Sequence, residues 1–185
     1  MNQPNAKLAE LVISAKPKCG ETVVIAIDGP AGSGKTTFAS QLHDLVSNSG
    51  VVHMDDLYRG WDNTLTPDLS FTLQKLLSDI SSRRQLSYQK YDWELHKLAQ
   101  PTDSSAPKIL ILEGVGAGQK SIEEFVSILI WIEVPTLIGL ERVIQRDGIE
   151  VAPFMEEFLQ SQSRHFEQED TKKRADYHLS GLPTN

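Results

Sequence analysis

Cysteine is almost absent from this sequence, and long apolar runs are absent altogether. The single cysteine, Cys19, excludes an internal disulfide and a zinc site built from cysteines. The longest apolar run, residues 126–134, is interrupted by Ser127 and Glu133 and falls far short of the ~20 residues that a membrane span needs. We therefore expect no membrane partner.

An excess of positive charge is also lacking. Lys and Arg total 18 against 25 Asp and Glu, which gives a net charge of −7. This balance disfavours a nucleic-acid partner held by general electrostatic attraction, while a locally basic phosphate pocket stays allowed. Charged residues are scattered through residues 1–19, so no signal peptide is indicated and we expect a cytoplasmic protein.

The length of 185 residues predicts a single domain over residues 1–185. Short β-branched runs alternate with longer amphipathic stretches, which predicts an α/β fold with a parallel sheet. Strands are expected at 23–27, 51–53, 109–112, 128–134 and, weakly, 175–179, and helices at 35–47, 71–82, 122–125 and 137–146. The composition of residues 101–107 predicts a loop.

Residues 29–36 (GPAGSGKT) match the Walker A pattern of glycine, four residues, then Gly-Lys-Thr. The glycines let the backbone curl so that its N–H groups face phosphate oxygens, and the following helix adds the positive end of its dipole. We expect Lys35 to bridge the β- and γ-phosphates of ATP and the Thr36 hydroxyl to bind Mg²⁺. The predicted ATP-binding residues are Gly29, Ala31, Gly32, Ser33, Gly34, Lys35, Thr36 and Thr37.

Carboxylates follow two of the predicted strands, where ligands bind in an open α/β sheet. Asp55 and Asp56 follow the second strand, and one of them can accept the proton of an attacking hydroxyl and help to hold the metal. The alternative for this pair is a helix N-cap. Glu113 follows the third strand at the Walker B position and would orient Mg²⁺, unless it is a solvated strand-end charge. We interpret residues 114–118, GVGAG, as a flexible turn close to the ligands.

A phosphate-binding loop alone does not distinguish kinases from other nucleotide hydrolases. The sequence lacks the Asn-Lys-x-Asp motif that reads guanine, and it is short for a remodelling ATPase. Arg142 and Arg146 are spaced i,i+4 on a predicted helix, so they share a face and could stabilise phosphate charge during transfer. The alternative for these arginines is a solvated ion pair with Glu141 or Glu150. Because the guanine motif is missing and the length is short for a remodelling ATPase, small-molecule kinases are the favoured class.

Four segments in the same order resemble uridine kinases and their phosphoribulokinase-like relatives. They are the Walker A residues 29–36, residues 55–59 (DDLYR), residues 91–96 (YDWELH) and residues 112–114 (LEG). The family pattern Asp-x-Phe-Tyr reads here as Asp-Asp-Leu-Tyr, and Tyr-Asp-Phe-x-x-His reads as Tyr-Asp-Trp-Glu-Leu-His. Residues 171–177 also resemble the segment that leads into the last strand of the family.

The resemblance implies a three-layer α/β/α P-loop NTPase fold with a five-stranded parallel sheet and a small helical lid at about 142–165. It also implies an acceptor-site excursion at about 55–100, with Asp55 as general base and Arg146 in the lid. An alternative to an acceptor-side role is that Tyr91 and Trp93 are core aromatics and that His96 is a solvated helix residue. Trp61 could form a wall of the acceptor pocket or could simply be packed. The expected acceptor-side residues are Tyr58, Asp62 (or Asp68), Tyr91, His96 and Arg142.

These patterns together predict an ATP- and Mg²⁺-dependent kinase that phosphorylates a hydroxyl of a nucleoside-like small molecule. Asp55, Lys35 and Arg146 are the expected catalytic residues, and Thr36, Asp55 and Glu113 the expected metal residues. Two alternatives stay open: a kinase of another small alcohol or a nucleotide monophosphate, and a regulatory P-loop ATPase. A homo-oligomer is also left open.

Overall fold

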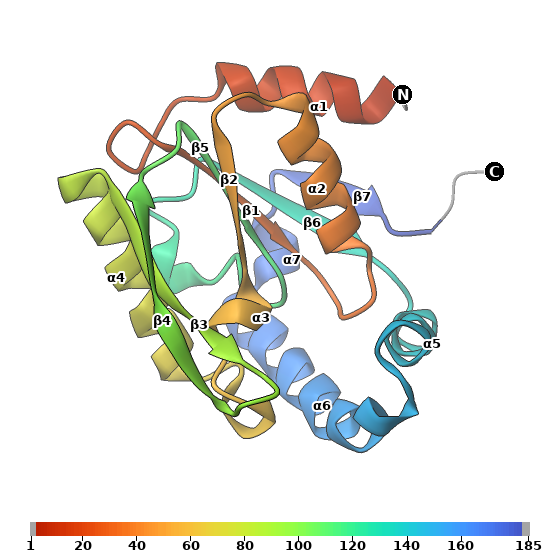
Figure 1. The fold of residues 1–185 in the computed structure, drawn as a ribbon. Coiled ribbons are helices and arrows are strands. Elements are labelled where there is room, and N and C mark those ends of the chain that lie inside the picture. Colours follow the sequence, from red (N-terminus) through yellow and green to blue (C-terminus); the bar gives the residue numbers. More distant parts are fainter. Residues whose placement is uncertain (1–2, 183–185) are drawn as a thin grey trace.

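The central sheet holds five parallel strands in the order β2-β5-β1-β6-β7 (Figure 1). The structure is a computed structural model that describes residues 3–182. The five strands are β1 (Val23–Asp28), β2 (Ser49–His53), β5 (Ile109–Glu113), β6 (Ile128–Glu133) and β7 (Tyr177–Ser180). All strands run the same way, so their carboxyl ends meet along one edge. The predicted α/β/α P-loop fold with a five-stranded parallel sheet is confirmed.

Helices cover both faces of the sheet, which explains the nearly continuous apolar runs of the strands. One face, with Ile25 and Ile111, packs under α1 (Gln3–Ser14) and α2 (Lys35–Leu45). The other, with Val24 and Leu110, packs under α4 (Pro67–Arg83) and α6 (Ala152–Glu169). None of the helices in the described range is long and apolar enough to cross a membrane.

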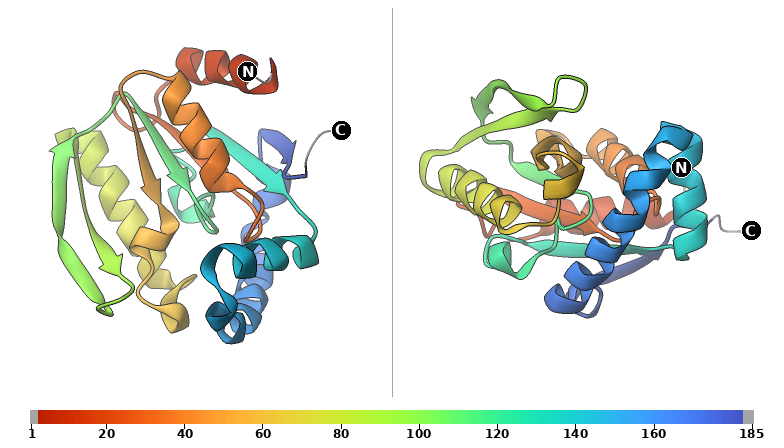
Figure 2. Two further views of the ribbon diagram at one scale, coloured as in Figure 1. Left: turned by 45° about the vertical axis from the view of Figure 1, so that its right-hand side comes forward. Right: turned by 90° about the horizontal axis from the view of Figure 1, so that it is seen from below.

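The remaining elements are short or lie outside the sheet. α5 (Thr136–Asp147) follows β6, and a separate hairpin of β3 (Gln85–Asp92) and β4 (Lys97–Ser105) lies beside α4 (Figures 1 and 2). The short helices are α3 (Met54–Leu57), α7 (Thr171–Arg174), η1 (Trp61–Asn63), η2 (Lys120–Ile122) and η3 (Ile149–Val151).

Two local predictions were wrong. The loop expected at 101–107 is mostly β4, in which every residue is exposed, so no apolar alternation marks it as a strand. Pro101 fits because β4 is an edge strand and the pairing shifts register beside it, between Gln89 and Tyr91. The helix expected at 122–125 is only the single turn of η2, which ends at Ile122.

Candidate active site

The Walker A loop joins β1 to α2 at the carboxyl edge of the sheet. Gly34 precedes α2 with a φ of 94°, and no described side chain caps that helix, so its first N–H groups stay available to an anion. Gly32 has a φ of 72°, and a Cβ there would collide with the carbonyl of Gly139 on α5. Glycine is therefore required at Gly32 both by its backbone conformation and by this close approach.

Lys35 is folded back over the loop in which it lies. Its Nζ donates to the carbonyl oxygens of Gly29 and Pro30, both at 2.8 Å. Burial lowers the pKa of Lys35, while the nearby carboxylates of Asp28, Glu113 and Asp55 raise it. The only predicted catalytic cation in the loop is thus held at the phosphate site and surrounded by carboxylates.

Glu113 links three of the elements at this edge. Its Oε1 accepts hydrogen bonds from the Thr36 hydroxyl at 3.1 Å and from His53 Nδ1 at 2.5 Å. The hydrogen bond to Glu113 raises the pKa of His53, which favours the imidazolium form. The structure therefore brings together two of the predicted metal residues, Thr36 and Glu113, and adds a histidine that the sequence did not single out.

Asp55 lies in α3, directly after β2, and remains accessible to solvent. Protein atoms crowd its carboxylate, and this desolvation, with the negative charge of Glu113, raises its pKa, while Lys35 and Arg146 oppose the rise. A raised pKa makes a carboxylate a better proton acceptor. The N-cap of α3 is His53, so the capping alternative does not apply to Asp55. Asp56 instead forms an ion pair with Lys90 of the hairpin at 2.7 Å.

The two predicted arginines of α5 have different partners. Arg146 is exposed and makes two hydrogen bonds of 2.6 Å to the carboxylate of Asp147, while contributing positive charge near Asp55. Arg142 donates to the carbonyl oxygens of Gly32, at 3.1 Å, and Gly181, at 2.9 Å. Arg142 therefore contacts the phosphate-binding loop itself, and the proposed ion pairs with Glu141 or Glu150 are not its described contacts.

Aromatic rings join the predicted acceptor-side segment to the predicted lid. Trp61 stacks on Phe154 of α6, with ring centroids 5.3 Å apart and planes 8° apart, and Trp93 also lies 5.3 Å from Trp61. The Trp93 indole N–H donates to the backbone carbonyl of Asp55 at 3.0 Å. Tyr91 packs edge-on against Trp93. These rings thus lie next to the predicted base.

The other predicted acceptor residues are spread over different surroundings. Tyr58 is only 3% exposed, and its hydroxyl donates to the carbonyl of Val115 at 2.7 Å, which does not favour contact with an acceptor. Asp62 is exposed in η1. His96 is exposed in the turn of the hairpin with a φ of 50°, so the alternative of a helical residue is wrong.

Comparison with known proteins shows which family the chain belongs to. No family model matches the chain. A uridine kinase from Ureaplasma parvum is 30% identical over 142 residues, which cover 68% of this chain and 69% of that protein. A uridine kinase from Limosilactobacillus reuteri is 26% identical over 145 residues, and the match covers 69% of this chain and 66% of that relative's length. The chain belongs to the uridine kinase-like family of P-loop kinases.

The fold of this chain is similar to that of one solved structure, of a possible uridine kinase from Bacillus stearothermophilus. It has a TM-score of 0.68 at 21% identity, and the match covers 96% of this chain and 98% of that one. This likeness supports the arrangement of sheet and helices described above.

Sequence reasoning missed two buried polar residues of the uridine kinase-like site. Asp28, fully buried, accepts hydrogen bonds from the backbone N–H groups of Gly29, Gly116 and Gly118 at 2.7–3.1 Å. Burial raises the pKa of Asp28. Its place directly before the first Walker A glycine was the available signal. These bonds hold the buried 114–118 segment in place, against the expectation of a flexible turn.

The second missed residue is Gln162 of α6, which is 5% exposed. Its Oε1 accepts a hydrogen bond of 2.8 Å from the backbone N–H of Ala31, within the Walker A loop. No local pattern marks a glutamine 131 positions away as a partner of that loop.

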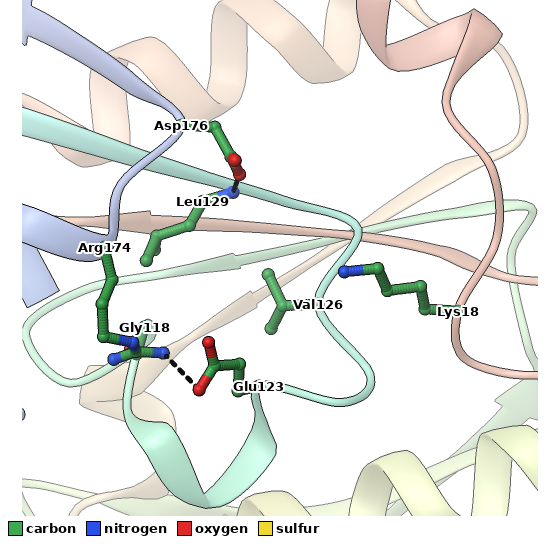
Figure 3. Close-up of a pocket in the computed structure, with 7 residues that line it drawn as sticks. All are labelled: Lys18, Gly118, Glu123, Val126, Leu129, Arg174 and Asp176. Carbon is green, nitrogen blue, oxygen red and sulfur yellow. Dashed lines mark hydrogen bonds and ion pairs between the residues drawn. The ribbon is translucent and has the colours of Figure 1, made fainter.

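Figure 3 shows residues that line a cavity of about 100 Å³, and none of the lining residues belongs to the Walker A loop. Three of the cavity's charged side chains have protein partners. Arg174 donates to the Gly118 and Glu169 carbonyls and lies 3.5 Å from Glu123, and Asp176 accepts from the Leu129 N–H. Ligand pockets usually measure roughly 300–1,000 Å³, so this cavity is too small for a nucleoside.

Proposed function

We propose that the chain is an ATP-dependent kinase that transfers the γ-phosphate to a hydroxyl of a nucleoside-like small molecule. The observation that carries this proposal is the charge environment of Asp55. A carboxylate with a raised pKa lies beside Lys35, Glu113 and Arg146, next to a Walker A loop. An ATPase could direct the same carboxylate at water. The Trp93 ring, whose N–H donates to the backbone carbonyl of Asp55, favours an organic acceptor instead.

In the proposed reaction, Asp55 accepts the proton of the acceptor hydroxyl as its oxygen bonds to the γ-phosphorus. The bond between that phosphorus and the bridging oxygen breaks, and ADP leaves. Lys35 and Arg146 stabilise the negative charge that spreads over the transferred group. Arg146 would exchange its bonds to Asp147 for contacts with phosphate oxygens.

The residues present fit ATP and Mg²⁺. The uncapped start of α2 suits phosphate binding, for which Gly29 and residues 31–37 are proposed. Thr36, Glu113 and Asp55 would hold Mg²⁺, which supplies charge neutralisation when bound. Among the described residues, no group of three His, Cys, Asp or Glu is arranged as a metal site by itself. Mg²⁺ in phosphoryl-transfer sites commonly relies on one or two carboxylates with the phosphates, so the set is adequate.

A nucleoside-like acceptor is supported by the relatives' names and by the aromatic side chains beside Asp55. The relatives from Ureaplasma parvum and Limosilactobacillus reuteri described above are each named uridine kinase. Trp93 donates to the backbone carbonyl of Asp55 and packs edge-on against Tyr91, so two aromatic rings lie near the proposed general base. Aromatic rings are suited to contact with a flat heterocycle. We propose one domain over 1–185, acting in the cytoplasm on a small molecule, with acceptor side 55–100 and lid 142–165. Asp62 and His96 would contact the acceptor only from exposed positions.

The test is a phosphotransfer screen with Mg–ATP over nucleosides, other small alcohols and nucleotide monophosphates. We expect a nucleoside to raise ADP release well above the rate with water. Asp55→Asn should lower kcat by at least about 100-fold, because general base catalysis contributes at least that factor. The matched control, Asp103→Asn, changes an exposed carboxylate of β4 and should leave kcat unchanged. ATP hydrolysis that no acceptor accelerates would contradict the proposal and favour the regulatory ATPase.

A further inference from the structure

The outer side of the Walker A loop is held by residues that come much later in the chain. Gly139 of α5 packs so closely that a Cβ on it would collide with the carbonyl of Ala31. Arg142 donates to the carbonyl of Gly32, and Gln162 accepts from the N–H of Ala31. We call these three residues the loop clasp. Two consecutive loop residues are thus fixed through their backbone polar groups.

Within the loop clasp, Gln162 has the most specific contact. Its side chain is buried, and a buried amide oxygen is costly unless it accepts a hydrogen bond. It satisfies this need with the backbone of the loop that binds phosphate. The same helix carries Phe154, whose ring stacks on Trp61 at the acceptor side. Helix α6 therefore contacts both sides of the proposed reaction.

We propose that Gln162 is a positioning residue for the nucleotide donor, which it serves by fixing the Ala31 peptide and so the shape of the Walker A loop. This inference rests on the proposed function, because it assumes that the loop binds Mg–ATP. A loop that is already shaped loses less conformational freedom when nucleotide binds. Loss of the Gln162 bond weakens donor binding while leaving acceptor binding unchanged.

The experiment measures Mg–ATP binding by calorimetry for the full chain and for Gln162→Met, which keeps the length of the side chain but removes the acceptor oxygen. We expect roughly fivefold weaker binding, which corresponds to about one hydrogen bond. The matched control is Gln160→Met, an exposed glutamine of the same helix, and it should bind like the unchanged chain. In kinetic assays the KM for ATP should rise with Gln162→Met and the KM for the acceptor should not.

Equal affinities for Gln162→Met and the unchanged chain would overturn the inference, as would an equal rise in both KM values. If Gln162→Met does not fold, Gln162→Leu serves instead, because it also removes the acceptor oxygen and adds no charge beside the loop. It should bind Mg–ATP more weakly with an unchanged KM for the acceptor, and unchanged nucleotide affinity would overturn the inference. The two proposals fail separately. A chain that binds Mg–ATP but phosphorylates no acceptor contradicts only the proposed function.

Discussion

The structural role of individual polar residues at this site depends on the backbone groups to which they hydrogen-bond. Asp28 is the clearest case, because both of its carboxylate oxygens accept N–H groups from two separate glycine-containing turns. Such a group cannot be recognised from residue type alone. It requires knowledge of where residues 114–118 lie.

Asp28→Asn should destabilise the fold. Asparagine replaces one acceptor oxygen with an N–H₂ group that would face a backbone N–H, leaving a buried donor unsatisfied, at a cost of about 1–3 kcal/mol. The free energy of unfolding measured in urea should fall by that amount. Asp103→Asn on the exposed strand β4 is the control. Equal stability of the two variants would show that the three hydrogen bonds to Asp28 contribute little.

His53 should make stability depend on pH. Its pKa is raised above the ordinary 6.5 in the folded chain, chiefly by the hydrogen bond to Glu113. The stabilisation is therefore complete below about pH 6.5 and is lost as the pH rises through the raised value. Melting temperatures without Mg²⁺ should show a gap between the unchanged chain and His53→Gln that closes toward alkaline pH. A constant gap would contradict this.

At the scale of elements, the aromatic contact between η1 and α6 joins the proposed acceptor side to the proposed lid. Phe154→Ala should cost about 1 kcal/mol of stability, because it removes a stacked ring pair. It should also raise the KM for the acceptor more than that for ATP, since Trp61 loses its support. Phe71→Ala, at an exposed phenylalanine of α4, is the matched control. A larger effect on the KM for ATP would contradict this assignment.

The buried strands of the central sheet could be predicted from the sequence, and the exposed strand β4 could not. The strands β1, β5 and β6 are nearly continuous apolar runs because both faces are covered. Their positions were confirmed within a few residues. The hairpin strand β4 is polar and wholly exposed, so its composition reads as a loop. The residues of η2 form a single turn that is too short to show a helical period.

At the scale of the whole molecule, site residues that belong to local motifs could be predicted, whereas contacts between residues far apart in the chain could not. The placement of Lys35, Thr36, Asp55 and Glu113 at one edge of the sheet could be predicted, because each lies in a local motif or at the end of a strand and parallel strands bring those ends together. Gln162 and Arg142 could not be assigned to the loop, since nothing local encodes a contact across 131 or 110 positions.

The loop clasp also has a consequence for synthesis of the chain. The Walker A motif leaves the ribosome early, but Gly139, Arg142 and Gln162 emerge more than 100 residues later. A nascent chain that ends before residue 139 would carry the motif without the contacts that hold its outer side. Capacity to bind nucleotide should therefore arise late in translation, after most of the core strands have been made.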